Sequence, residues 1–247
     1  MSEVSHETFN FKKMLYNEAK NIGLDLDDKC LKRLETYKDL LIEWNEKINL
    51  TAITDEYEVI MKHFIDSLEL VKYIEKEKKV IDIGTGAGFP GLVISIYFDG
   101  KSFVTLVDAL NKRINFLQEV IEKLKLNNIE ALHSRAEEIG HNESHREKYD
   151  YAVSRAVAPL NILLEYDVGF VKPKGKCLLL KGNKFDEEIS ASKKALQILN
   201  CEITNIYEYA YIVGEENYKR KIIEVLKNNN TNNKYPRNYG KIKKNPL

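Results

Sequence analysis

Apolar residues recur in the first part of the chain at intervals of three or four positions, the spacing of one helix face. The clearest stripe consists of Leu31, Leu34, Tyr37, Leu41, Trp44 and Ile48. A second stripe follows over residues 59–71, after the segment 48–54. Asp27 or Asp28 supplies the acidic first turn that favours a helix N-terminus. The pattern predicts a helical N-terminal extension.

From Lys79 onward, short apolar runs alternate with amphipathic segments, which is typical of a parallel sheet with helical crossovers. The predicted strands cover 80–83, 103–107, 129–133, 149–154 and 175–182, and the predicted helices cover 92–97, 112–126, 158–171 and 184–199. The runs 202–213 and 218–226 indicate a closing antiparallel hairpin. We expect an α/β, Rossmann-like, mostly parallel doubly wound sheet. The expected domains are a helical extension (1–78), the Rossmann-like domain (79–227) and a C-terminal tail (228–247).

Residues 80–91 combine a buried strand, a glycine-rich turn and the start of a helix. Gly84, Gly86 and Gly88 alternate there, and glycine lets backbone N–H groups approach a ligand closely. The dinucleotide fingerprint G-x-G-x-x-G would need glycine where Phe89 stands. The spacing therefore favours a nucleoside without phosphates, of which S-adenosylmethionine is the commonest cofactor. The alternative is a purely structural turn.

Two further positions fit the same cofactor. Asp108 ends the second predicted strand, where a carboxylate can bind both ribose hydroxyls; alternatively it caps the helix that begins near Asn111. Ala136 and Glu137 follow the third strand, in the loop that faces the adenine half of a nucleoside in such a fold. The alternative for this loop is a plain helix cap.

Arg155 lies just past the end of the fourth predicted strand, and Lys181 lies at the C-terminal end of the fifth. Arg155 suits the carboxylate of the cofactor, a phosphate of the substrate or a neighbouring acid on the surface. The segment 154–157 lacks the Asn or Asp followed by Pro-Pro and an aromatic residue that many amino-methyltransferases use. No cysteine stands there to act as the nucleophile of a pyrimidine-C5 methyltransferase. Those two chemistries are disfavoured.

Two other groups of polar residues are weaker candidates. His63, Asp66 and Ser67 lie within about one helical turn, so they cannot converge as nucleophile, base and orienting group. We expect His63 to be hydrogen-bonded locally. His141 and His145 are spaced as helix neighbours, but no further ligand pattern supports a zinc site. We expect no metal.

Composition limits the class of protein. The chain has 247 residues, 43% of them apolar, and a formal net charge of zero. No global field therefore attracts nucleic acid or membrane. The three cysteines Cys30, Cys177 and Cys201 form no C-x-x-C pair, which suits a reducing compartment. Residues 1–11 lack a signal-peptide pattern, and no apolar run approaches the roughly 20 residues that span a bilayer. We expect a cytoplasmic, monomeric protein that does not enter membranes.

Local clustering changes this picture at the C-terminus. From Lys219 onward the chain carries nine basic residues against one acid, Glu224, with Tyr235 and Tyr239 among them. Such a segment can supply phosphate contacts and base stacking, which suits RNA. The candidate substrate-binding residues are Lys181, Arg237, Lys243 and Lys244. The alternative is a solvated, disordered tail.

Taken together, these segments resemble the RsmG family, formerly called glucose-inhibited division protein B, over essentially the whole chain. The matching segments are 49–53 (NLTAI), 63–68 (HFIDSL), 84–91, 107–108 with 112–113, 135–138 (RAEE), 154–156 (SRA), 181–182, 234–237 (KYPR) and 244–247 (KNPL). Residues 238–242 depart from the family's usual ending. The resemblance therefore gives the least support for contacts made by the tail.

The resemblance implies a class I S-adenosylmethionine methyltransferase that modifies N7 of a guanine, nucleotide 527, in the 530 loop of bacterial 16S rRNA. It implies cofactor contacts at Gly84, Phe89, Ala136, Glu137 and Arg155. The implied partner is 16S rRNA, free or in the small ribosomal subunit or its assembly intermediate. Guanine N7 has a lone pair and no proton, so no catalytic residue is expected beyond those that bind and orient.

Two other functions remain open from the residues alone. One is a methyltransferase for a small molecule or a protein, which would not need residues 228–247. The other is a nucleotide-binding RNA module without catalysis, or a nicotinamide enzyme. Phe89 in the glycine turn favours S-adenosylmethionine over NAD.

Overall fold

The computed structural model describes residues 10–155, 157–182 and 185–247. Three of the sequence predictions concern positions outside the described residues. These positions are residues 1–9, Ala156 of the family motif and the predicted helix start at Lys184. Within the described ranges, no helix is both long enough and apolar enough to cross a membrane.

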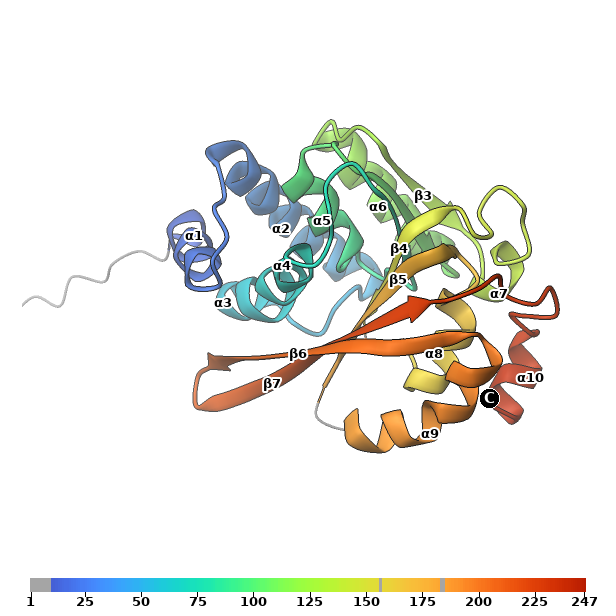
Figure 1. Cartoon of the computed structure of the whole chain (residues 1–247). Helices are drawn as coiled ribbons and strands as arrows, with labels where there is room; N and C mark the ends of the chain where they lie inside the picture. Colours follow the sequence, from blue (N-terminus) through green and yellow to red (C-terminus); the bar gives the residue numbers. More distant parts are fainter. Residues whose placement is uncertain (1–9, 156, 183–184) are drawn as a thin grey trace, which may run out of the picture.

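A single twisted sheet organises the described residues, with the strand order β3-β2-β1-β4-β5-β7-β6 (Figure 1). Strands β1 to β5 pair in parallel, β7 pairs antiparallel with β5, and β6 pairs antiparallel with β7. The strands are β1 (Lys79–Ile83), β2 (Phe103–Asp108), β3 (Ile129–His133), β4 (Tyr149–Arg155), β5 (Val171–Lys181), β6 (Cys201–Val213) and β7 (Glu216–Lys227). The doubly wound, mostly parallel sheet and its closing hairpin are confirmed.

Helices connect the parallel strands and build the N-terminal extension. They are α1 (Phe11–Asn21), α2 (Asp28–Ile48), α3 (Glu56–Val59), the π-helix η1 (Ile60–Ile65), α4 (Asp66–Val71), α5 (Gly91–Phe98), α6 (Asn111–Lys123), α7 (Ala136–Ile139), α8 (Leu160–Asp167), α9 (Phe185–Ile198) and α10 (Tyr239–Lys244). The predicted helix over 158–171 is too long, because Val171 already pairs with Tyr149 in the sheet.

Alternating side chains divide the buried apolar residues between the two faces of the sheet. Val80 and Leu178 belong to one cluster, whereas their neighbours Ile81 and Leu179 belong to the other. The first cluster also takes in residues of α1, α2, η1, α4, α5 and α6. The N-terminal extension thus shares one continuous core with a face of the sheet.

The C-terminal segment packs on the opposite face, contrary to the alternative of a disordered tail. Tyr235, Ile242 and Leu247 are buried in the second cluster, beside residues of α8 and α9. Arg146 donates hydrogen bonds to the carbonyls of Thr231 and Tyr235 at 2.7 and 2.8 Å. Residues 228–247 are therefore part of the folded molecule.

Close packing at the start of α5 predicts the effect of one added methyl group. A Cβ on Gly91 would lie 2.4 Å from Leu106 Cδ2 and 2.7 Å from Asp82 Cβ. We expect Gly91→Ala to lower the free energy of unfolding by about 1–3 kcal/mol, measured by urea denaturation, because the buried site is overpacked. The control is Gly240→Ala in α10, where the Cβ would meet Asn238 Oδ1 at 3.7 Å, and where no loss is expected. Equal stability of the Gly91 variant and wild type would contradict the packing.

Candidate functional site

The glycine turn between β1 and α5 has the backbone that the sequence predicts. Gly84 and Gly86 have φ of +69° and +62°, which favours glycine at both positions. Gly84 and Thr85 donate their N–H groups to Val107 O at 2.9 and 3.0 Å, so the turn is tied to β2. The turn therefore lies at the carboxyl edge of the sheet, where ligands bind in this class of fold.

Asp82 holds the turn from below. Its Oδ2 accepts hydrogen bonds from Thr85 Oγ1 and Gly91 N, both at 2.7 Å, whereas Oδ1 has no partner in the described part of the chain. Complete burial raises the pKa of Asp82 to about 7, although these two hydrogen bonds favour the charged form. The carboxyl group fixes the turn and the start of α5 relative to each other.

A cavity of about 460 Å³ opens above the turn. This volume lies in the range of roughly 300–1,000 Å³ that is usual for small-molecule sites. The lining residues come from the turn, the end of β2, the N-terminal extension and the end of β4. They are Leu50, Thr51, His63, Gly84, Thr85, Gly86, Ala87, Phe89, Asp108, Ala109, Leu110, Arg113, Arg155 and Val157.

A smaller cavity of about 160 Å³ adjoins the first one and shares Gly84, Asp108, Ala109 and Val157 with it. Ala136 and Glu137 line this second cavity, at the start of α7. The seven residues predicted to bind the cofactor thus line two neighbouring cavities at one edge of the sheet. They are Gly84, Gly86, Phe89, Asp108, Ala136, Glu137 and Arg155.

Asp108 connects the turn to α6. Its Oδ2 accepts hydrogen bonds from Gly86 N at 3.0 Å and from Arg113 Nη1 at 3.1 Å. Its Oδ1 accepts from Leu110 N at 2.9 Å, next to the first turn of α6. Both interpretations of Asp108 therefore have a structural basis, since the side chain supports the helix start and also lines both cavities.

The far end of the larger cavity is formed by a stack of aromatic rings. Phe89 lies between Tyr37 and His63, with ring centroids 5.2 and 4.5 Å away and the planes within 24° and 18° of parallel. The guanidinium carbon of Arg155 lies 5.0 Å from the centroid of Phe89. Residues of the extension and of the glycine turn therefore form one wall of the cavity together.

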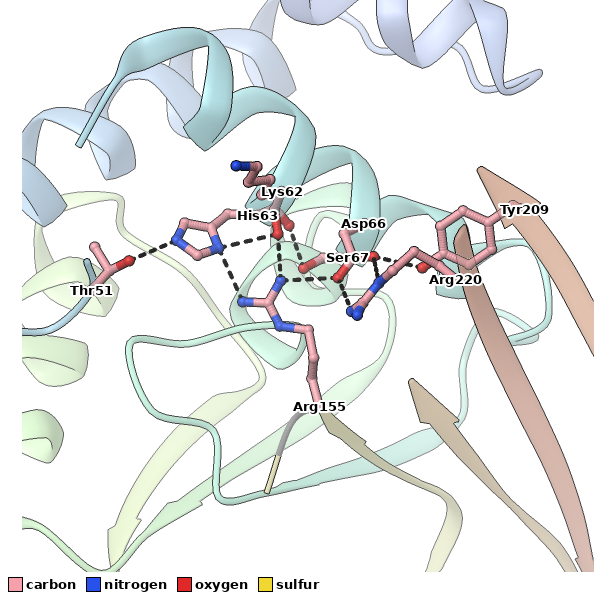
Figure 2. Close-up of polar contacts among 8 residues, drawn as sticks. All are labelled: Thr51, Lys62, His63, Asp66, Ser67, Arg155, Tyr209 and Arg220. Atoms are coloured by element: carbon pink, nitrogen blue, oxygen red, sulfur yellow. Dashed lines mark hydrogen bonds and ion pairs between the residues drawn. The ribbon is translucent and has the colours of Figure 1, made fainter. Parts of the chain in front are cut away.

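Arg155 is bound by the helical segment that carries His63 (Figure 2). Its Nη1 donates to Lys62 O at 2.9 Å and to Asp66 Oδ2 at 3.2 Å, and Nη2 lies 3.2 Å from His63 Nδ1. The Asp66 N–H bonds to Met61 O, five residues earlier as in a π-helix, and also to His63 O. Such turns occur often at functional sites. The partner of Arg155 in the structure is an acid, but Asp66 is buried and does not lie on the surface as predicted.

Asp66 has three partners from two distant segments. Arg220 donates to both of its carboxylate oxygens at 2.8 Å, and Tyr209 donates at 2.7 Å (Figure 2). Burial alone would raise the pKa of Asp66, but Arg220 and Arg155 hold it below its usual range. The side chain is 1% exposed and charged. It ties α4 to β4 and to the hairpin.

His63 is electrically neutral in this arrangement. Burial and the nearby Arg155 lower its pKa to about 3. Its Nε2 lies 2.9 Å from Thr51 Oγ1, and Thr51 Oγ1 also accepts from Ile53 N at 3.0 Å. Ser67 donates to the backbone carbonyl of His63, so the three polar residues form no triad. His63 has one local contact, from Nδ1 to Lys62 O at 3.2 Å. Its other partners, Thr51 and Arg155, come from separate segments, which the expectation of local hydrogen bonding did not include.

Two of the predicted substrate-binding residues have internal partners instead. Lys181 is 7% exposed and bonds to Ala158 O and Glu188 Oε2, both at 2.6 Å. Arg237 forms two hydrogen bonds to the buried Glu165, at 2.8 and 2.7 Å. Both charges are paired within the fold.

Further basic residues of the region from Lys219 onward are paired in the same way. Arg220 binds Asp66, Lys221 binds Glu208 and the fully buried Lys227 binds Glu147. Lys243 and Lys244 are exposed on α10. The basic surface of the C-terminus is therefore smaller than the sequence suggests.

His141 and His145 also have separate partners. His141 Nε2 lies 2.8 Å from Pro236 O, and His145 Nδ1 lies 2.6 Å from Tyr149 Oη. The described residues contain no group of three or more potential ligands that could hold a metal ion.

Sequence reasoning missed Thr51, His63 and Asp66 as parts of the site. The available signal was a set of polar residues at 63, 66 and 67 in an otherwise apolar helix, which is where buried polar groups need partners. The partners Arg155 and Arg220 lie about 90 and 150 residues away in the chain, so spacing alone could not identify them.

The fold is shared with proteins of known structure. A SAM dependent methyltransferase from Aquifex aeolicus matches with a TM-score of 0.52 at 20% identity, over 70% of this chain and 94% of that one. M. jannaschii TYW2 in complex with AdoMet matches with a TM-score of 0.51 at 16% identity, over 66% and 76% of the two chains. The fold and the position of the cavities define the class I methyltransferase architecture.

Sequence comparison identifies the family within this class. The family described as rRNA small subunit methyltransferase G matches residues 30–214. Proteins named Ribosomal RNA small subunit methyltransferase G from Alkaliphilus metalliredigens and Acetivibrio thermocellus are 45% and 46% identical, over 96% and 99% of this chain and 98% and 100% of their own lengths. The chain belongs to this family, as its resemblance to RsmG implied.

The buried charge of Asp66 predicts a pH-dependent stability. Because its pKa is lowered in the folded state, Asp66 stabilises the fold above its unfolded pKa of roughly 3.9, and this contribution is lost as the pH falls through the folded pKa. We expect Asp66→Asn to cost about 3–5 kcal/mol near neutral pH, measured by urea denaturation, since two arginines lose their charged partner. The difference in the free energy of unfolding between wild type and this variant should become smaller as the pH falls.

The matched control for this substitution is Asp25→Asn. Asp25 forms an ion pair with Lys20 on the surface, where its side chain is 77% exposed. Exposed ion pairs contribute about 1 kcal/mol at most. If Asp66→Asn lowered the free energy of unfolding no more than Asp25→Asn does, the stabilising role of the ion pairs between Asp66 and the two arginines would be contradicted.

Proposed function

We propose that the chain transfers a methyl group from S-adenosylmethionine to N7 of a guanine in the 530 loop of 16S rRNA, nucleotide 527. Family membership and the class I fold support a methyltransferase that uses this cofactor and modifies ribosomal RNA. The position on the base and the nucleotide are the finer part of the proposal. They come from the resemblance of the sequence motifs to RsmG.

The residues that line the cavities suit the chemistry of the cofactor. A Cβ on Gly86 would have Gly84 O at 3.9 Å as its neighbour, so the surface of the turn is open to a ligand. Asp108, 4% exposed, can accept hydrogen bonds from ribose hydroxyls, and the backbone at Ala136 and Glu137 can bond to adenine. Arg155 remains a candidate for the carboxylate end. When bound, the cofactor supplies an activated methyl group.

The electrostatics near Phe89 suit alkylation of a nitrogen that carries no proton. Guanine N7 needs positioning for in-line attack and needs no general base. The methylated base is a cation, so a lone positive side chain nearby would oppose its formation. Here His63 is neutral, and Arg155 is paired with Asp66, a carboxylate that it shares with Arg220. The pairing of Arg155 with a buried carboxylate is the observation that carries the proposed chemistry.

RNA contacts are proposed for Lys243 and Lys244. Both are exposed on α10, and Tyr239, the first residue of this helix, lines the second cavity. Phosphate contacts from such lysines give affinity that falls with salt concentration. The 16S rRNA would reach the site across this surface, as free RNA or within the small subunit or its assembly intermediate.

The proposed position of methylation can be mapped directly. Ribosomal RNA from a host that lacks the gene should be unmodified at this guanine and should gain N7 methylation after incubation with the protein and S-adenosylmethionine. N7-methylguanine is detected by borohydride reduction and aniline cleavage of the RNA. Methylation at another base, or at another atom of this guanine, would overturn the finer proposal and leave the family assignment intact.

The role of Asp108 can be tested by binding. We expect Asp108→Asn to weaken S-adenosylmethionine binding by about 1–3 kcal/mol in calorimetry, because a charged acceptor of hydrogen bonds is lost. The control is Asp150→Asn, at the start of β4, where the carboxylate bonds to Lys79 N and Lys172 and lines neither cavity. Equal affinities of both variants and wild type would leave Asp108 as a helix support.

A further inference from the structure

The C-terminal helix supplies one side chain to the wall of the second cavity. Tyr239, the first residue of α10, lines this cavity together with Ala136 and Glu137. It also lines a more open groove of about 480 Å³ beside Arg135 and His141. Tyr239 therefore lies where the cavity proposed for adenine meets this groove, together with Arg135 and Glu137.

The position of Tyr239 is fixed by its neighbours in the chain. Asn238 caps α10 by accepting a hydrogen bond from Lys241 N at 3.0 Å. On one side His141 bonds to Pro236 O, and Arg237 is held by Glu165. On the other side Ile242 is fully buried. The segments on both sides of Tyr239 therefore hold it in place.

Tyr239 also lies next to positive charge. The guanidinium carbon of Arg135 is 5.5 Å from its ring centroid, and Lys243 Nζ is 5.7 Å away. Cations at this range are attracted to an aromatic face. One short helix therefore carries both a wall of the cavity and exposed lysines that suit a phosphate backbone.

We propose that Tyr239 is a cofactor-binding residue that closes the adenine half of the site, and that RNA bound along α10 raises the affinity for the cofactor. This inference rests on the proposed function, because it takes the second cavity as the adenine site and RNA as the ligand of Lys243 and Lys244. Coupling of this kind is reciprocal, so bound cofactor equally raises the affinity for RNA.

The first test measures binding of S-adenosylhomocysteine, which has no methyl group to transfer, by calorimetry without RNA. Tyr239→Ala should raise its Kd roughly 3- to 10-fold, as expected for the loss of one aromatic contact. Tyr239→Phe should bind like wild type, because the ring and not the hydroxyl forms the wall. The control is Tyr16→Ala, an exposed tyrosine of α1 with Lys20 over its ring. An unchanged Kd for Tyr239→Ala would overturn the inference.

The second test measures the same Kd by equilibrium dialysis with and without saturating unmodified 16S rRNA. Wild type should bind S-adenosylhomocysteine about 5-fold more tightly or better with RNA present. Tyr239→Ala should lose this gain, whereas Tyr16→Ala should keep it. An equal gain in wild type and Tyr239→Ala would overturn the coupling.

Failure of the proposed function would give a different result. If wild type binds S-adenosylhomocysteine but does not methylate the guanine, the proposed reaction is wrong and the calorimetric test of Tyr239 still decides its contact with the cofactor. If wild type does not bind S-adenosylhomocysteine, the assignment of the cavities fails before any variant is compared.

Discussion

The buried carboxylate of Asp66 is the interaction on which the geometry of the site depends. It binds Arg155 at the end of β4 and Arg220 in β7, so it joins the helical extension, the parallel sheet and the hairpin. A charge that is 1% exposed is stable only because these partners and Tyr209 compensate for its lost hydration. Because Arg155 also contacts His63, the same carboxylate orients the wall of the larger cavity.

The polar groups beside Phe89 in the larger cavity carry less free charge than their number suggests. Asp66 pairs with Arg155 and also with Arg220, so these three side chains together carry one positive charge, and burial keeps His63 uncharged. A paired arginine repels a ligand that becomes positively charged less than a free arginine would. Binding and orientation are then sufficient for the chemistry that we propose.

The sequence was sufficient to predict a doubly wound sheet with a closing hairpin and the positions of the residues around the glycine turn. Periodicity identified β1 to β5, and Gly84, Asp108 and Ala136 line the cavities because strand ends meet at one edge. Partners across long distances were not predictable. Lys181 and Arg237 read as free cations, since no local pattern announces that Glu188 and Glu165 neutralise them. Charge counts overestimate a basic surface when ion pairs form between remote segments.

The packing of Phe89 makes the structures of the extension and the sheet depend on each other. This ring belongs to the glycine turn, yet it is 4% exposed because Tyr37 and His63 of the extension enclose it. An exchange of the extension between relatives would therefore have to bring matching residues at both stacking positions. A substitution on either side of the stack would change the packing of both parts.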